Sequence, residues 1–232
     1  MVKGIFFDLD GVLLDSMPYH AEAMYQALEL EIDYKLDKKW IFLLEGMPAD
    51  EFLYELFKHN PPKTTIDREI ITKIVDLKKK IFKEIENTTI VDGVKELLES
   101  LDKTSCIKAI VSGASRKEVQ HIIDKKIGNR NFDVIITGDD VTRGKPDPQP
   151  FLAALMNTNL VRKDALIVEN SPFGIMSAYY ADIKYIITLN NTPLTISDFY
   201  DFLPMPIKNH FKKYIFKSTR LTKDFILDWV YK

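Results

Sequence analysis

The 232-residue sequence contains a single cysteine, Cys106. One cysteine excludes an internal disulfide and favours a reducing compartment, so we expect a cytoplasmic protein. The longest apolar runs are only as long as a strand, and no transmembrane helix is expected. The N-terminus is unlike a signal peptide, because Asp8 and Asp10 interrupt any apolar stretch there.

The sequence also lacks a marked excess of charge of either sign. Its 32 basic and 34 acidic residues give a formal net charge of −2, so we expect no nucleic-acid or membrane-surface partner. No internal repeat or low-complexity tract is visible. The length suits one large domain or two unequal ones. The sequence does not define an oligomeric state, and we expect a monomer.

The most informative stretch is the N-terminus, where Ile5-Phe6-Phe7 leads into Asp8, Asp10 and Gly11. This apolar run is too short for a helix and is typical of a buried strand. Side chains at i and i+2 of a strand point to the same side, so the two carboxylates share one side of the strand end. Such a pair needs a cation, and Mg²⁺ prefers hard oxygen ligands. Taken alone, a solvated Asp-x-Asp-Gly turn explains the stretch equally well.

Residues 16–88 show helical patterns only. Ser16 is a suitable N-cap with Pro18 in the first turn, and Asn60-Pro61-Pro62 is the clearest break. The spacing of apolar residues in the last helix predicts that Lys78 lies on a solvated face. The predicted helices cover residues 18–30, 37–45, 48–59 and 67–86. With no strand between them, they predict a separate helical unit.

From residue 89 onward, strand and helix patterns alternate. Ser115 to Glu118 has capping-box spacing, Asp147 is the expected N-cap of the helix that follows it, and Ser171 is expected to cap the next one. This alternation predicts an α/β fold with a parallel sheet and right-handed crossovers. We expect strands at 107–111, 132–137, 165–168 and 185–189, a short strand at 214–216, and a last helix from about 222. Residues 192–213 suggest no function.

Polar residues follow several of the predicted strands. In open parallel sheets, ligands bind beyond the carboxyl ends of the strands, so these residues should converge at one edge. The N-terminal pair of carboxylates would then be joined by a hydroxyl, an ammonium, a further carboxylate and a carboxamide. They belong to Ser112, Lys145, Glu169 and Asn170.

This set of groups suits phosphoryl transfer, which depends on charge neutralisation and alignment. Asp8 would be the nucleophile, and Asp10 could protonate the leaving oxygen and then activate water. The Ser112 hydroxyl could hold a phosphoryl oxygen, and Lys145 could neutralise charge. Standing alone, Ser112 would be a turn residue and Lys145 a solvated surface residue.

Asn170 can offer Mg²⁺ a neutral oxygen, and Glu169 can contribute directly or through water. The alternative role for Asn170 is helix capping, for which Ser171 competes. Asp139 and Asp140 form a second acidic pair, which we rank lower because the glycines around them suggest a turn. His20 is the histidine closest to the N-terminal pair.

Together, these segments resemble the haloacid dehalogenase-like hydrolase superfamily over nearly the whole chain. The resemblance implies a Rossmann-like core at 1–15 and 89–232, a helical cap inserted at 16–88, and a Mg²⁺-dependent aspartyl-phosphate mechanism. It is closest to the branch with β-phosphoglucomutases and sugar-phosphate phosphatases. The four matching motifs, in chain order, are Asp8-Leu9-Asp10-Gly11-Val12, Ser112, Lys145, and Glu169-Asn170-Ser171 with Gly174-Ile175.

Two departures from the branch affect the expected function. The branch often has an aspartate where this chain has Asn170, which removes a negative charge from the metal site. Mutase-like caps usually carry basic residues in the stretch that matches residues 44–49, where this chain has Glu45 and Ala49. The second departure favours a phosphatase over a mutase.

We therefore expect a Mg²⁺-dependent phosphatase that hydrolyses a small phosphorylated metabolite, such as a sugar phosphate. The alternatives are a β-phosphoglucomutase and a catalytically weak phosphate-binding protein. Asp8 and Asp10 are the expected catalytic residues. The expected metal ligands are Asp8, Asp10 (through its backbone carbonyl), Glu169 and Asn170. The residues expected to bind phosphate or substrate are Ser112, Gly113, Lys145, His20 and Glu45.

Overall fold

The computed structural model describes residues 2–127, 132–209 and 215–231. Its centre is a parallel sheet of six strands in the order β3-β2-β1-β4-β5-β6. This confirms the predicted α/β fold. The short last strand is confirmed at two residues, while Tyr214, predicted to begin it, lies outside the described residues, as does His210. The strands are β1 (Gly4–Phe7), β2 (Ile107–Val111), β3 (Val134–Ile136), β4 (Ala165–Glu169), β5 (Lys184–Thr188) and β6 (Ile215–Phe216).

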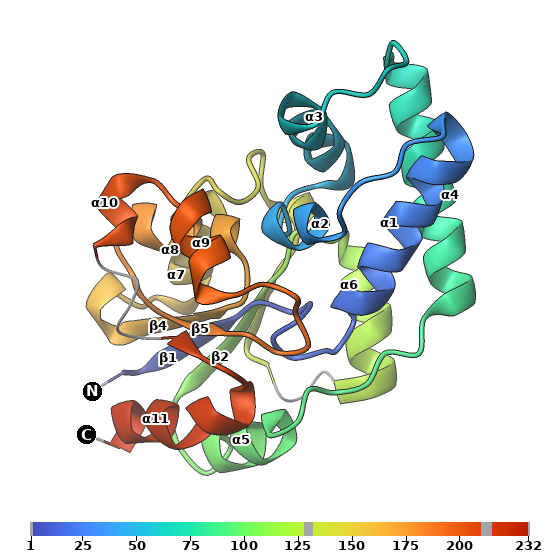
Figure 1. The fold of residues 1–232 in the computed structure, drawn as a ribbon. Coiled ribbons are helices and arrows are strands. Elements are labelled where there is room, and N and C mark those ends of the chain that lie inside the picture. Colours follow the sequence, from blue (N-terminus) through green and yellow to red (C-terminus); the bar gives the residue numbers. More distant parts are fainter. Residues whose placement is uncertain (1, 128–131, 210–214, 232) are drawn as a thin grey trace.

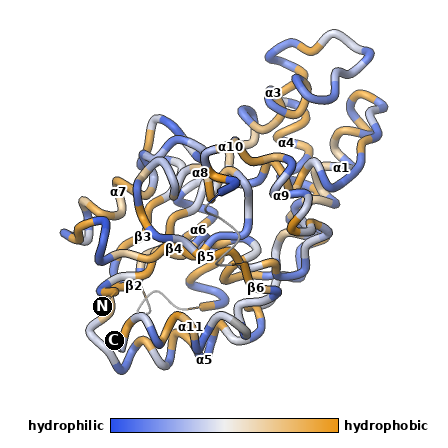
Figure 2. The backbone as a smooth tube through the Cα atoms, turned by 60° about the vertical axis from the view of Figure 1, so that its left-hand side comes forward, coloured by the Kyte–Doolittle hydropathy of each residue, from blue (hydrophilic) through white to orange (hydrophobic). Residues whose placement is uncertain are grey.

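Helices cover both faces of this sheet (Figure 1). In β1, Phe6 packs into the core on one face and Phe7 into the core on the other, and neither side chain is exposed. Burial on both faces explains why β1 is a continuous apolar run. The Phe7 face is covered by α5 (Val94–Leu101), α6 (Arg116–Ile122) and α11 (Thr219–Tyr231), and the Phe6 face by α7 (Gln149–Thr158) and α8 (Pro172–Tyr180). Figure 2 shows hydrophobic residues concentrated along the central strands.

The predicted helical unit lies beside the sheet, with α1 and α4 packed along one another (Figure 1). Helix α4 buries Ile71, Ile74 and Ile81 on one side, as an amphipathic helix should. Lys78 differs from its prediction, because it is half-buried and contacts His20. The unit comprises α1 (Met17–Ile32), α2 (Lys39–Leu43), α3 (Ala49–His59) and α4 (Arg68–Ile85).

The segment after β5 connects the sheet side to the helical unit. It contains α9 (Ile196–Phe202) and α10 (Met205–Lys208). Lys39 of α2 pairs with Asp198 of α9 at 3.3 Å. The His59 ring lies between Trp40 and Phe202, at centroid distances of 5.1 and 6.2 Å. Helix α9, in the segment for which the sequence suggested no function, thus packs against α2 and α3.

Most of the helix starts named in the sequence were predicted correctly, although one side-chain cap and one start differ. Ser115 forms a capping box with Glu118, and Ser171 accepts a hydrogen bond from the Gly174 N–H. Ser16 takes the N-cap position of α1, but its hydroxyl bonds to Asp10 and caps nothing. Asp147 is not the N-cap of α7, because the helix begins at Gln149 with Pro148 in that position.

The remaining helical pieces are short: a π-helical turn at Ile123–Ile127 and 3₁₀ turns at Gly138–Asp140 and Arg162–Asp164. In the described part of the chain, every helix is too short or too polar to span a bilayer.

Candidate active site

The predicted site residues lie at the carboxyl edge of the sheet. Asp8 directly follows β1, and its backbone N–H donates to Val168 O of β4 (2.9 Å). Ser112 directly follows β2, and Glu169 is the last residue of β4. Because β2, β1 and β4 are neighbours in a parallel sheet, their carboxyl ends bring these side chains to one edge.

Lys145 is the central cation of this edge. It is 1% exposed, although lysine is almost never buried without a charged partner. Its ammonium donates to Asp8 Oδ1 (2.5 Å), to Glu169 Oε1 (2.5 Å) and to the Val111 carbonyl (3.1 Å). Burial alone would lower the pKa of Lys145, but the two carboxylates raise it above its ordinary value. Lys145 therefore stays protonated at physiological pH.

Asp8 depends on that cation. Burial raises the pKa of Asp8 to about 8, an effect that Lys145 opposes and Glu169 reinforces. Without a neighbouring positive charge, a carboxylate this deeply buried would take up a proton. Lys145 thus moves Asp8 towards its ionised, nucleophilic form, while the net pKa stays at about 8.

Glu169 is fixed on both of its oxygens. Oε1 accepts from Lys145, and Oε2 accepts from the backbone N–H groups of Asn170 (2.9 Å) and Ser171 (3.2 Å). A side chain at Gly174 would place its Cβ within 1.9 Å of the Glu169 carboxyl group, so glycine is required there. Glu169 therefore orients Lys145 and has little freedom for other partners.

Asn170 faces the helical unit. Its Nδ2 donates to Glu45 Oε2 (2.9 Å), and its Oδ1 is buried with no hydrogen-bond partner among the described residues. A Cβ at Gly11, where φ is +80°, would approach Asn170 Nδ2 to 2.1 Å, so this position needs glycine for space and for backbone conformation. Because Ser171 caps α8, Asn170 is free of the capping role.

Asp10 belongs to a second polar cluster, which links β1 to the helical unit. It accepts from the Ser16 hydroxyl and lies 3.3 Å from His20 Nε2. The other ring nitrogen of His20 lies 2.9 Å from Lys78 Nζ, and the ring stacks on Phe82 at 4.1 Å. Burial and Lys78 lower the pKa of His20. Burial would raise the pKa of Asp10, but His20 and Ser16 outweigh it and lower it.

Lys78 is a site residue that sequence reasoning missed. The helical spacing predicted that Lys78 lies on a solvated face. In the structure it lies one turn before Phe82, whose ring stacks on His20, and no pattern in the sequence pointed to that contact.

The loop between α2 and α3 covers the edge of the sheet. Gly46 has φ +96°, and a Cβ there would lie 3.2 Å from Lys145 Cδ. A Cβ on Gly113 would lie 2.7 Å from the Gly46 carbonyl oxygen, so the loop packs directly on the segment after β2. Burial and the nearby Asp8 and Glu169 raise the pKa of Glu45 in this loop well above its ordinary value.

A cavity of about 230 Å³ lies between the two parts of the chain. Ser112, Gly113 and Lys145 line it from the sheet side. Pro48, Asp50 and Glu51 line it from the helical unit. Three of the predicted phosphate-binding residues thus border one cavity, while Asp8 and Asp10 are not among the residues that line it.

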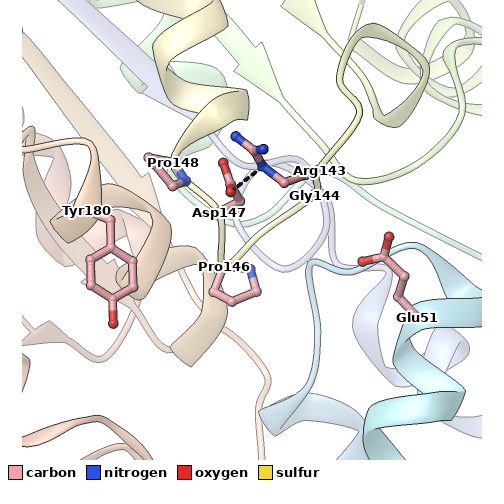
Figure 3. A pocket seen from close by; sticks show the side chains of 7 residues that line it. All are labelled: Glu51, Arg143, Gly144, Pro146, Asp147, Pro148 and Tyr180. Atoms are coloured by element: carbon pink, nitrogen blue, oxygen red, sulfur yellow. Dashed lines mark hydrogen bonds and ion pairs between the residues drawn. The ribbon is translucent and has the colours of Figure 1, made fainter.

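A larger, open hollow of about 440 Å³ is lined by the loop that carries Lys145, at residues 143–148 (Figure 3). Arg143 pairs there with Asp147 at 2.6 Å, and Glu51 points in from α3. None of the predicted catalytic residues lines it. The second acidic pair is also engaged elsewhere, since Asp140 binds Arg116 and Thr137 and Asp139 accepts from the Arg116 N–H. Neither feature competes with the site around Lys145.

Comparison with known proteins agrees with this arrangement. The family model for haloacid dehalogenase-like hydrolases matches residues 5–188. A phosphorylated carbohydrates phosphatase from Thermotoga maritima is 28% identical over 187 residues, which cover 80% of this chain and 84% of that protein. Hexitol phosphatase A from Escherichia coli is 28% identical over 193 residues, covering 79% and 82%.

Solved structures share the fold. A putative β-phosphoglucomutase from Bacteroides vulgatus superposes with a TM-score of 0.80 at 23% identity, and the match covers 100% of this chain and 91% of that one. The four sequence motifs, the parallel sheet and the family match over most of the chain agree with one another. The chain therefore belongs to the haloacid dehalogenase-like hydrolase family.

Proposed function

We propose that this protein is a Mg²⁺-dependent phosphatase that hydrolyses a small phosphorylated metabolite, of the sugar-phosphate class, through an aspartyl-phosphate on Asp8. The observation that carries the proposal is the buried Lys145 ammonium, held 2.5 Å from Asp8 Oδ1 and 2.5 Å from Glu169 Oε1. A carboxylate nucleophile held against a fixed cation, which itself lines the cavity, is what phosphoryl transfer requires. Relatives that are named phosphatases of carbohydrate phosphates support the substrate class.

In this proposal the chain has two domains. Residues 1–15 and 89–232 form the core, and residues 16–88 form a cap that covers the cavity and excludes water. The support is the position of the loop at Gly46, which lies against Lys145 and Gly113.

The chain's own residues then divide the reaction between them. An Asp8 carboxylate oxygen attacks phosphorus and forms the P–O bond of the aspartyl-phosphate, while the bond to the leaving oxygen breaks. Because His20 and Ser16 lower the pKa of Asp10, this carboxylate must first take up a proton before it can give one to the leaving oxygen. Asp10 later removes a proton from the water that attacks phosphorus, while the P–O bond to Asp8 breaks. Lys145 neutralises the charge gathered between Asp8 and the phosphoryl group, and Ser112 and Gly113 border the space for its oxygens.

The donors at the sheet edge fit Mg²⁺ in chemistry. The described residues include no group of three or more histidine, cysteine, aspartate or glutamate side chains around a common metal position. Lys145 accounts for this, since it occupies the space between Asp8 and Glu169. The buried Asn170 Oδ1, which lacks a partner among the described residues, is the donor that a hard cation would use. Asp8, the Asp10 carbonyl and Asn170 would hold the ion, with Glu169 acting through water. When bound, Mg²⁺ would neutralise and align the phosphoryl oxygens.

A mutase function has less support. A phosphosugar mutase must hold a second phosphate, yet Lys145 is the one basic residue among those described around the cavity, while Asp50 and Glu51 line its cap side. Solved structures named as β-phosphoglucomutases are 20–23% identical to this chain, which shows a shared fold alone.

A substrate panel separates the three candidate functions. We expect phosphate release from one or more sugar phosphates with Mg²⁺ and none after chelation with EDTA. Isomerisation of β-glucose 1-phosphate without phosphate release would identify a mutase. Binding of phosphorylated ligands by calorimetry, without turnover at saturating Mg²⁺, would identify the weak binding protein. A cytoplasmic location and a monomeric state stay predictions from the sequence.

A further inference from the structure

Glu45 brings another carboxylate to a site that already contains several. It comes from the loop between α2 and α3 and is half-buried against the sheet edge. Its hydrogen bond runs to the Asn170 amide, at 2.9 Å. Asp8, Glu169 and Asp10 all act on it as like charges, and Lys145 is the one opposing charge among the groups that act on it most.

The nearby cations are already committed. Lys145 donates to both Asp8 and Glu169. Lys78 lies behind His20, on the Asp10 side of the site. Glu45 is therefore left as an acidic group for which the described residues supply no cation of its own, although a partly buried carboxylate is costly without one.

Glu45 is also poorly suited to hold a phosphate. Two like charges at 4 Å repel by about 4 kcal/mol at the effective dielectric of a protein surface. A carboxylate at this position can instead bind a cation or accept from a hydroxyl group.

Asn170 supplies the second, independent observation. Its amide nitrogen is used on Glu45, while its oxygen is buried and has no partner among the described residues. A buried oxygen left unpaired costs about 1–3 kcal/mol, so it needs a donor or a cation. The two departures noted in the sequence, a negative charge absent at Asn170 and one present at Glu45, thus meet in space.

We propose that Glu45 is a ligand of the divalent cation at this site, where it supplies from the helical unit the charge that Asn170 lacks. The proposal rests on the Mg²⁺ site of the proposed function. It makes the cation a bridge between the helical unit and the sheet, so that binding of the ion holds the Gly46 loop over Lys145.

Titration calorimetry of Mn²⁺ into the substrate-free, full-length protein measures this role without turnover. We expect Glu45→Gln to bind Mn²⁺ on the order of 10- to 100-fold more weakly than the wild type, because the amide keeps an acceptor but loses the charge. Glu55→Gln is the matched control. It removes the same charge from α3, where Glu55 pairs with the exposed Lys58, and its Mn²⁺ affinity should stay within about twofold of the wild type.

A charge exchange adds a second test. In the Glu45→Gln background, Asn170→Asp returns a negative charge to the sheet side of the site, and we expect it to restore most of the lost Mn²⁺ affinity. Thermal midpoints without metal report whether each variant folds. Saturating Mn²⁺ should raise the midpoint of the wild type more than that of Glu45→Gln.

The possible failures are distinguishable. If the wild type binds neither Mn²⁺ nor Mg²⁺, both this inference and the metal-dependent phosphatase are wrong. If the wild type binds the ion and releases phosphate with it, but Glu45→Gln binds it equally well, only the role of Glu45 is wrong. A Glu45 that serves the substrate alone gives this second result, with a raised KM. A loss that Asn170→Asp does not restore contradicts the exchange of charge between the two positions.

Discussion

Lys145 Nζ lies 2.5 Å from Asp8 Oδ1, and neither side chain is more than 7% exposed. The pair joins the loop before α7 to the end of β1, so it connects parts of the chain that are far apart in sequence. The same ammonium reaches Glu169. Two buried carboxyl groups therefore share one buried cation.

Loss of that cation should be costly. We expect Lys145→Met to lower the free energy of unfolding at pH 7 by about 3–5 kcal/mol, because it leaves two buried carboxyl groups without their cation. Urea denaturation followed by circular dichroism measures the change. Part of the loss should be recovered as the pH is lowered below about 8, because Asp8 without its cation takes up a proton in the folded protein. An unfolding free energy equal to that of the wild type at pH 7 would show that the ion pair contributes nothing.

The His20–Lys78 contact makes a prediction about titration. Burial and Lys78 both lower the pKa of His20 in the folded protein. We expect Lys78→Met to raise it, because removal of a nearby positive charge favours the protonated imidazole. NMR titration of the ring protons measures the value, and His20→Gln assigns the signal. A His20 pKa that does not change in Lys78→Met would contradict the contact.

Cys106 should be unreactive in the native protein. Burial raises the pKa of its thiol to about 11, so the thiol is protonated at pH 8. The side chain is also buried, which keeps reagents away from it. We expect a thiol reagent to modify it slowly at pH 8, and at the rate of a free cysteine in denaturing urea. Rapid modification of the native chain at pH 8 would show that this part of the structure opens readily.

The convergence of polar residues at the sheet edge could be predicted because it depends on local patterns and one topological rule. Apolar runs identified the strands, and parallel order places the residues after Phe7 and Val111 at the same edge as Glu169. The helix caps at Ser115 and Ser171 were equally local.

Other features of the site could not be predicted, since they depend on how the helical unit packs against the sheet. The Ser16 hydroxyl has two possible partners, the helix backbone and Asp10, and only the folded chain brings the second within reach. By helical spacing Lys78 belongs to a solvated face. In the fold, however, α4 packs along α1, and this packing brings Lys78 into contact with His20. The contact between Glu45 and Asn170 joins residues 125 positions apart, and no local pattern encodes it.

The central claim is that Asp8 is the nucleophile of a Mg²⁺-dependent phosphatase. The most direct test compares phosphate release by the wild type and by Asp8→Asn, on the best substrate of the panel and with saturating Mg²⁺. We predict that Asp8→Asn retains the wild-type circular dichroism spectrum and loses turnover by about 10³-fold or more, because the amide cannot attack phosphorus. Full Mg²⁺-dependent turnover by a folded Asp8→Asn variant would contradict the account.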